Sequence, residues 1–122
     1  MRARIRALLL AWVHGIVVVS LVPSSGVSLW NLDKVGHFVA YAGLSSLVCL
    51  SFDATPVRLA LSVVGVGLGA VLEFAQQFIP GRDMSSIDGL VNTLGVIVGL
   101  LLFRLTGPWL RRLVAKTFQV RG

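Results

Sequence analysis

Ionisable and polar side chains gather in two short stretches of an otherwise apolar chain. The stretch at residues 33–41 contributes Asp33, Lys34, His37 and Tyr41. The stretch at residues 73–92 contributes Glu73, Gln76, Gln77, Arg82, Asp88 and Asn92. Ionisable groups next to hydrocarbon are costly unless they have partners or a function. We therefore take these two stretches as the candidate functional site.

The residue types in the two stretches allow two kinds of chemistry. Lys34 and Arg82 could hold an anionic group, because ammonium and guanidinium cations bind phosphate and carboxylate. His37 and Glu73 could act as a proton-transfer pair. Glu73 could instead form a buried ion pair with Arg82 or Lys34 that only fixes helix packing. One histidine among carboxylates is a poor ligand set for zinc, so we expect no metal and no other cofactor.

The spacing within each stretch places polar residues on one side of a helix, because residues four apart lie on the same helical face. Three series have this spacing: Asp33 with His37 and Tyr41, Glu73 with Gln77, and Asp88 with Asn92. Gln76 and Gln77 are adjacent, so they cannot both face one pocket. One of the two is expected to pack against a neighbouring helix.

Several of these residues also have an ordinary structural explanation. Asp33 could be the N-cap of a helix, where its carboxylate would accept a free backbone N–H. Ser85 and Asp88 stand three residues apart, which is the spacing of a capping box at a helix start. Asn92 could form a hydrogen bond to a neighbouring helix. These alternatives stay open from the sequence alone.

Composition places the chain among membrane proteins. Of its 122 residues, 56% are hydrophobic and 13% are charged, and the mean hydropathy is +0.88. Soluble domains are about one quarter charged, so this chain cannot form a water-facing surface. The net charge is +6, and the basic residues lie in the short segments that flank the apolar runs. The sequence shows neither the basic helix nor the interleaved aromatic pattern of a nucleic-acid-binding protein. We expect a single transmembrane domain over residues 1–122 and no nucleic-acid partner.

Four apolar runs predict an all-α membrane protein, a bundle of four transmembrane helices over residues 7–22, 35–52, 57–79 and 87–105. The first run follows three arginines, which also suits a cleavable signal peptide. No clear Ala-x-Ala site follows it, so we favour a retained helix. Residues 107–121 combine apolar and basic side chains and predict an amphipathic tail on the membrane surface.

The distribution of Lys and Arg predicts the orientation. Nine of the eleven lie before residue 7, at residue 58 or from residue 104 onward, and cytoplasmic segments are rich in these residues. Both termini are therefore expected in the cytoplasm, with the two polar stretches at the outer side. At 1.5 Å per residue, Tyr41, Glu73 and Asn92 lie about 7–9 Å below the outer boundary. Three polar side chains from three helices at one depth predict a pocket.

Two glycine pairs predict close helix packing. Gly65 and Gly69 are four residues apart in the third predicted helix, and Gly95 and Gly99 are four apart in the fourth. Small residues at this spacing let another helix approach closely. We expect tight packing between these two helices, within one chain or across a homo-oligomer.

A set of short motifs runs through both polar stretches. They are Asp33-Lys34-x-x-His37-Phe38-x-x-Tyr41, Glu73-x-x-Gln76, Pro80-Gly81-Arg82, Asp88 and Asn92-x-x-Gly95. Together they resemble the VanZ-like family, which is named for a membrane protein linked to resistance to the glycopeptide teicoplanin. The resemblance implies a small multi-helix protein of the cell envelope. It also places eight residues at family motif positions: Asp33, Lys34, His37, Glu73, Gln76, Arg82, Asp88 and Asn92.

We therefore expect a VanZ-like protein of the bacterial cytoplasmic membrane whose outward-facing pocket binds the headgroup of a lipid or envelope component. The candidate ligand-binding residues are Asp33, Lys34, His37, Tyr41, Glu73, Gln76, Arg82, Asp88 and Asn92. The expected partners are membrane lipids, together with a cell-wall precursor or a glycopeptide. Two alternatives stay open: a membrane enzyme acting on a lipid-linked substrate, and a small dimeric proton-coupled exporter. Nothing in the chain resembles a nucleophile motif, so binding is favoured over catalysis and no catalytic residue is assigned.

Overall fold

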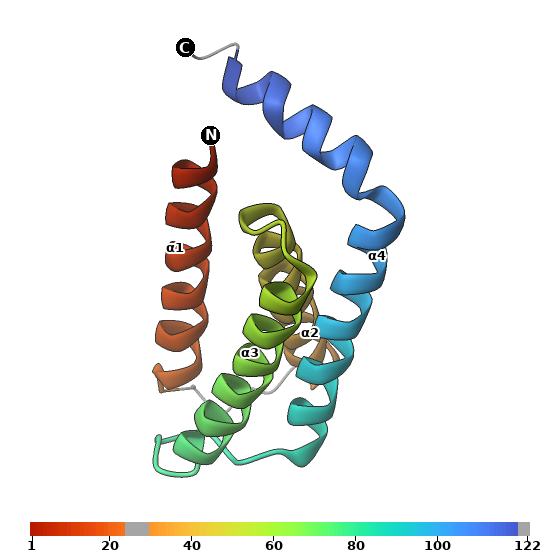
Figure 1. Cartoon of the computed structure of the whole chain (residues 1–122). Coiled ribbons are helices and arrows are strands. Elements are labelled where there is room, and N and C mark those ends of the chain that lie inside the picture. Colours follow the sequence, from red (N-terminus) through yellow and green to blue (C-terminus); the bar gives the residue numbers. More distant parts are fainter. Residues whose placement is uncertain (24–29, 120–122) are drawn as a thin grey trace.

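The computed structural model describes residues 1–23 and 30–119, which form four helices (Figure 1). They are α1 (Arg2–Leu21), α2 (Trp30–Ser51), α3 (Thr55–Gln76) and α4 (Ser86–Gln119). The prediction of an all-α chain is confirmed. The N-terminus and the end of α4 lie at one end of the bundle, and the turn between α3 and α4 lies at the other.

The other three helices pack on α2, which contacts each of them. Tyr41 and Leu44 of α2 form a core with Ile16 of α1, Leu72 of α3 and Val96 of α4. In lipid, apolar burial from water does not drive helices together, so close van der Waals packing has to hold them. The position of α2 among three neighbours therefore decides which side chains can meet.

Both glycine pairs lie against α2. A Cβ atom added at Gly99 would lie 2.5 Å from the carbonyl oxygen of Ala42, and one added at Gly95 would lie 2.6 Å from another α2 carbonyl oxygen. Gly65 and Gly69 of α3 face side chains of α2. The glycines thus bring α3 and α4 close to α2 rather than to each other. A homo-oligomer through either pair would have to displace α2, and it stays a prediction.

Three helices of the described chain are long and apolar enough to cross a membrane: α1, α3 and α4. Their outer faces expose large apolar side chains such as Leu10, Val63 and Leu90, each 70% exposed. Exposed apolar faces of this extent indicate a surface that contacts another apolar phase, such as the interior of a membrane. α2 falls outside this group, because its N-terminal part carries the first polar stretch.

The helix ends differ from the prediction at several points. α1 begins at Arg2 instead of residue 7, because arginine is a good helix former and the helix simply includes the basic segment. α2 begins at Trp30, so the residues before 35 belong to its first turns. α3 ends at Gln76, and the chain reverses at Gly81, whose φ of 75° lies in the left-handed region that favours glycine.

The fourth helix extends past its predicted end at residue 105, so most of the predicted amphipathic tail over residues 107–121 continues α4. The position of this segment on a membrane surface stays a prediction. α4 continues through Pro108, and its last turns lean across the end of the bundle that carries the N-terminus (Figure 1). Proline lacks an N–H and crowds the carbonyl four residues earlier, so it bends this helix without ending it. The guanidinium carbon of Arg4 lies 5.8 Å from the Phe118 ring centre, which joins the end of α4 to α1. Residues 120 and 121 of the predicted tail lie outside the described residues.

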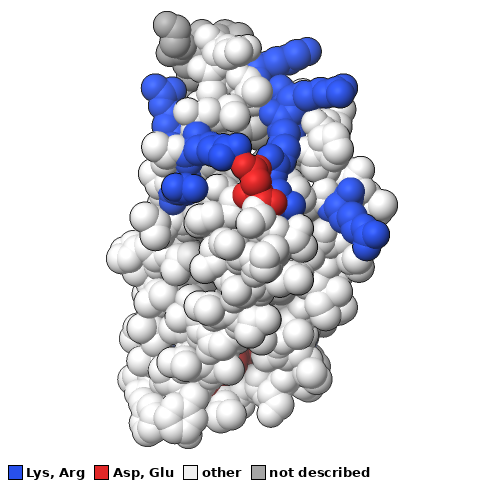
Figure 2. All heavy atoms as spheres, in the orientation of Figure 1, with Lys and Arg blue, Asp and Glu red and all other residues white. Residues whose placement is uncertain are grey.

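Basic side chains gather at this same end of the molecule (Figure 2). The residues at the start of α1, near the start of α3 and in the second half of α4 supply these side chains, and we call this region the basic end. They are Arg2, Arg4, Arg6, Arg58, Arg104, Arg111, Arg112 and Lys116. Asp53, between α2 and α3, accepts a hydrogen bond from Arg111 at 2.7 Å and pairs with Arg2. The Arg111 hydrogen bond, helped by the charge of Arg2, holds the pKa of the Asp53 carboxyl below its usual value. These contacts tie α1 and α4 to the α2–α3 connection.

Candidate functional site

Side chains from α2, α3 and α4 meet in one polar cluster at the end of the bundle opposite the basic end. The members of this polar cluster are Lys34, His37, Glu73, Asp88 and Asn92. The Nδ1 atom of His37 lies 2.9 Å from Oδ1 of Asn92 and 3.8 Å from Oε1 of Glu73. Glu73 and Asn92 are only 5% and 2% exposed, so these interactions act in a low-dielectric setting. The two polar stretches of the sequence come together in space.

The first turns of α2 supply Asp33 and Lys34. The Lys34 ammonium donates a hydrogen bond to Oδ1 of Asp88 at 3.0 Å, and the two side chains are 21% and 9% exposed. Oδ1 of Asp33 lies 3.9 Å from Nε2 of His37, one turn further along the helix. Because α2 begins at Trp30, Asp33 lies inside the helix, and its prediction as an N-cap is wrong.

The start of α4 contains half of the predicted capping box. The backbone N–H of Asp88 donates to Oγ of Ser85 at 3.3 Å. The reciprocal bond does not come from Asp88, whose carboxylate faces Lys34. The backbone N–H of Ser85 donates instead to Oε2 of Glu73 at 3.4 Å. The start of α4 therefore fixes the Glu73 carboxylate of α3, whose other oxygen faces His37.

Gln76 and Arg82 attach α1 to this end of the bundle. Gln76, 3% exposed, donates from Nε2 to the carbonyl oxygen of Ser20 at 3.1 Å, whereas Gln77 is exposed. Arg82 donates from Nε to the Val22 oxygen at 3.1 Å and from Nη2 to the Val19 oxygen at 2.9 Å. Cations at a helix C-terminus satisfy its last carbonyls. Arg82 therefore binds the end of α1 and does not pair with Glu73. Of the two adjacent glutamines, Gln76 is the one that packs against a neighbouring helix.

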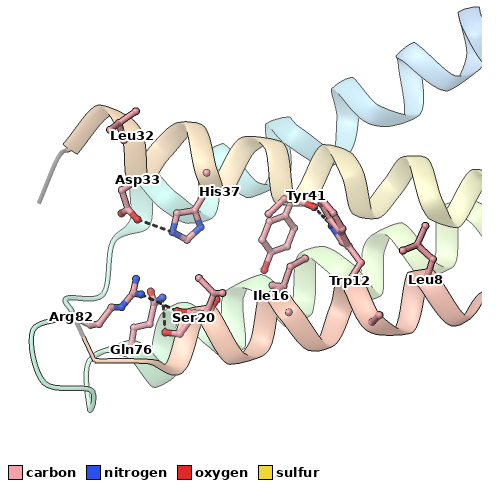
Figure 3. Close-up of a pocket in the computed structure, with 15 residues that line it drawn as sticks. Leu8, Trp12, Ile16, Ser20, Leu32, Asp33, His37, Tyr41, Gln76 and Arg82 are labelled. Carbon is pink, nitrogen blue, oxygen red and sulfur yellow. Dashed lines mark hydrogen bonds and ion pairs between the residues drawn. The ribbon is translucent and has the colours of Figure 1, made fainter. Parts of the chain in front are cut away.

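A cavity of about 490 Å³ lies between α1 and α2 beside the polar cluster. Figure 3 shows its polar lining residues, Asp33, His37, Gln76 and Arg82, together at one end. Apolar side chains line the rest, among them Leu8, Trp12, Ile16 and Val19 of α1. The α1 residues from Leu8 to Ser20 extend about 18 Å along the helix axis. We call this space the α1–α2 cavity.

His37 and Tyr41 separate the α1–α2 cavity from the rest of the polar cluster. Both line the cavity, whereas Glu73, Asp88 and Asn92 do not. Tyr41 is 2% exposed, and a Cβ atom added at Gly69 would lie 2.9 Å from its hydroxyl oxygen. The nine predicted residues thus divide into five that line the cavity and four that do not. Of these four, Glu73 and Asn92 contact His37, and Lys34 pairs with Asp88.

The sequence model of the family described as VanZ/LLP1 matches residues 3–107. The chain belongs to the VanZ/LLP1 family. No curated protein and no solved structure matches it. The matched range of this VanZ/LLP1 protein covers the whole polar cluster and ends at Gly107, directly before the bend in α4.

Three possible metal ligands of the VanZ/LLP1 protein lie close together, two in the polar cluster and one beside it. Donor atoms of Asp33, His37 and Asp88 all lie within 4.8 Å of one another. The Lys34 ammonium already neutralises Asp88 at 3.0 Å, and a bound cation would have to compete with it. The sequence-based expectation that no metal is bound stays a prediction.

The part played by α1 in this VanZ/LLP1 site was not predicted. α1 contributes backbone carbonyl oxygens to Gln76 and Arg82, and the Trp12 indole N–H donates to the Ala40 oxygen at 2.8 Å. Its cavity lining is otherwise apolar side chains and Ser20. A helix that offers carbonyl groups and hydrocarbon carries no polar motif, so the sequence held no signal for this role.

Proposed function

We propose that this VanZ/LLP1 protein binds a membrane lipid or a lipid-linked envelope component in the α1–α2 cavity. The observation that carries the proposal is the uneven lining of this cavity, which is polar at one end and apolar along the rest of α1. An amphiphile has the same division. Its headgroup would lie against Asp33, His37 and Arg82, and its hydrocarbon would lie along Trp12 and Leu8. Binding sites are commonly largely apolar with a few placed polar groups.

The polar end of the cavity suits a headgroup that combines an anion with a hydrogen-bond donor. Two of the five guanidinium N–H groups of Arg82 bind α1 carbonyls, so others remain for a phosphate or carboxylate oxygen. Asp33 is half exposed at the same end and would accept from a hydroxyl or amine of the ligand. Lys34 does not line the cavity, so its part is to support the cluster through Asp88.

The proposed arrangement in the membrane has four spans, with α2 held among the other three helices. The basic end would face the cytoplasm, because Lys and Arg are retained on that side. The α1–α2 cavity would then open its polar end to the outer leaflet of a bacterial cytoplasmic membrane. Cell-wall precursors are present at that leaflet, and glycopeptides act there. Binding of such a lipid-linked component in the cavity is how the chain would affect tolerance to teicoplanin.

A second candidate function is catalysis on a lipid-linked substrate. The observation that favours it is the setting of His37, which lines the cavity while Asn92 and Glu73 hold its Nδ1 side. A histidine oriented in this way can serve as a general base through its other nitrogen. Conversion of the retained lipid to a new mass by the purified protein, lost in His37→Gln, would support catalysis. A retained but unchanged lipid supports binding alone.

Filling the α1–α2 cavity tests the binding proposal. Gly36 and Gly15 line the cavity, and a Cβ atom at either position meets nothing within 4 Å. Leucine in place of Gly36 therefore enters the space intended for the lipid without a clash at its Cβ. We expect Gly36→Leu to lose at least about nine tenths of the lipid that the wild type retains, a change of about 1.4 kcal/mol or more. Native mass spectrometry of protein extracted in mild detergent measures the retained lipid.

The matched control is Gly67→Leu. Gly67 also has open space around its Cβ position, but it is exposed on α3 and does not line the cavity. It is expected to retain lipid like the wild type. Equal retention in Gly36→Leu, Gly67→Leu and the wild type would refute binding in the α1–α2 cavity.

A further inference from the structure

A second cavity, of about 960 Å³, lies at the basic end and shares no lining residue with the α1–α2 cavity. The end of α2, the start of α3 and the middle of α4 form its wall. Its charged lining residues are Arg58, Arg104, Arg111 and Asp53. Three cations against one acid leave this wall positively charged.

Two of the three arginines are held in fixed positions. Arg58 donates from Nε to the Phe52 oxygen at 2.7 Å, and Arg111 donates from Nη2 to the Cys49 oxygen at 3.1 Å. The guanidinium carbons of both lie over the ring of Phe103, at 5.3 Å and 5.5 Å from its centre. Both charges are therefore positioned before any ligand arrives, which lowers the ordering cost of binding an anion.

The third arginine, Arg104, differs from the other two because no interaction holds its side chain in the described part of the chain. Arg104 is exposed and makes no hydrogen bond or ion pair within residues 1–23 and 30–119. Asp53 already binds Arg111 and Arg2, so it does not offset the charge of Arg104. A cation in this position has its hydrogen-bond donors available to a ligand.

The other side of the cavity is apolar. Leu59, Ile97 and Leu101 line it and are 52%, 47% and 54% exposed. They continue along α3 and α4 toward the middle of the bundle, whereas Gly107 and Pro108 line the wall where α4 bends. The cavity thus joins three cations to a hydrocarbon face at the level where a membrane surface is expected.

We propose that this cavity binds the phosphate headgroup of an anionic phospholipid from the leaflet at the basic end. Arg58, Arg104 and Arg111 hold the phosphate, because guanidinium groups bind phosphate oxygens through paired N–H donors. An acyl chain of the same lipid lies along Leu59, Ile97 and Leu101. The α1–α2 cavity takes no part in this second site, so the two proposals can fail separately.

The test is a titration of the Gly36→Leu protein with lipids in detergent, followed by native mass spectrometry. Gly36→Leu is used because it removes the first site. Phosphatidylglycerol and phosphatidylcholine with the same acyl chains are compared, and inorganic phosphate is tested as a separate ligand. We expect phosphatidylglycerol to bind at this site and Arg104→Gln to weaken it about fivefold, since one cation near an anionic membrane surface contributes about 1 kcal/mol.

The matched control is Arg112→Gln, which removes the same charge from a position further along α4, beyond Pro108, that does not line the cavity. It is expected to leave phosphatidylglycerol binding within about twofold of the parent protein. Equal weakening by Arg104→Gln and Arg112→Gln would mean that general surface charge attracts the lipid, and it would overturn the site. Equal binding of phosphatidylcholine, or of inorganic phosphate, would overturn an anionic phospholipid as its occupant.

Discussion

Replacing Gly99 by alanine is expected to lower the free energy of unfolding by about 2–3 kcal/mol, the upper range for forcing an extra methyl group into a packed core. The added Cβ would overlap Oγ of Ser45 and would lie 2.5 Å from the carbonyl oxygen of Ala42. The serine can rotate away, but the α2 backbone can move only if α4 moves with it. Equilibrium unfolding in mixed micelles, followed by helical circular dichroism, measures the change.

Gly67→Ala is the control for Gly99→Ala. Nothing lies within 4 Å of a Cβ atom at Gly67, and alanine is the better helix former by about 1 kcal/mol. Gly67→Ala is therefore expected to unfold at the same or a higher denaturant concentration than the wild type. If Gly99→Ala were as stable as Gly67→Ala, the close contact between α2 and α4 would be wrong.

Replacing Asp88 by asparagine is expected to lower the free energy of unfolding by about 3 kcal/mol. This value is the low end of the range for removing one partner of a buried ion pair. We choose the low end because the Lys34 side chain is 21% exposed, so water still solvates part of its charge. Asparagine has the same shape, so the loss reports the missing negative charge beside the Lys34 ammonium at 3.0 Å. The same unfolding assay measures it.

Asp83→Asn provides the matching change outside the polar cluster. Asp83 is exposed and makes no hydrogen bond or ion pair within the described residues. Its replacement is expected to change the free energy of unfolding by less than about 0.5 kcal/mol, as surface substitutions usually do. A similar loss in both variants would show that Asp88 contributes only through net charge and not through its contact with Lys34.

The meeting of the two polar stretches could be predicted because periodicity and membrane orientation both constrain it. Residues four apart share a helical face, so His37 and Asn92 could be placed toward a common centre before their 2.9 Å contact was known. Membrane spans follow from hydropathy alone, and α1, α3 and α4 met that expectation. These features depend on local sequence, which a single chain displays directly.

Other features depend on which helix stands next to which, and the sequence does not state that. The small-residue pairs indicated close packing, but not that α2 would be the neighbour of both Gly69 and Gly99. Arg82 binds two carbonyl oxygens of α1, and carbonyl groups are present at every residue. Pro108 bends α4 without ending it, because contacts such as that between Arg4 and Phe118 hold the last turns in place.

The most direct test of the account is photolabelling with lipids that carry a diazirine either in the headgroup or at the end of an acyl chain. We expect the headgroup label on the α2 segment 32–37 and the chain-end label on the α1 segment 8–12, at the two ends of the α1–α2 cavity. Both labels should be lost in Gly36→Leu and kept in Gly67→Leu. Labelling confined to the outward-facing side chains, such as Val63 and Leu90, would contradict a lipid site between α1 and α2.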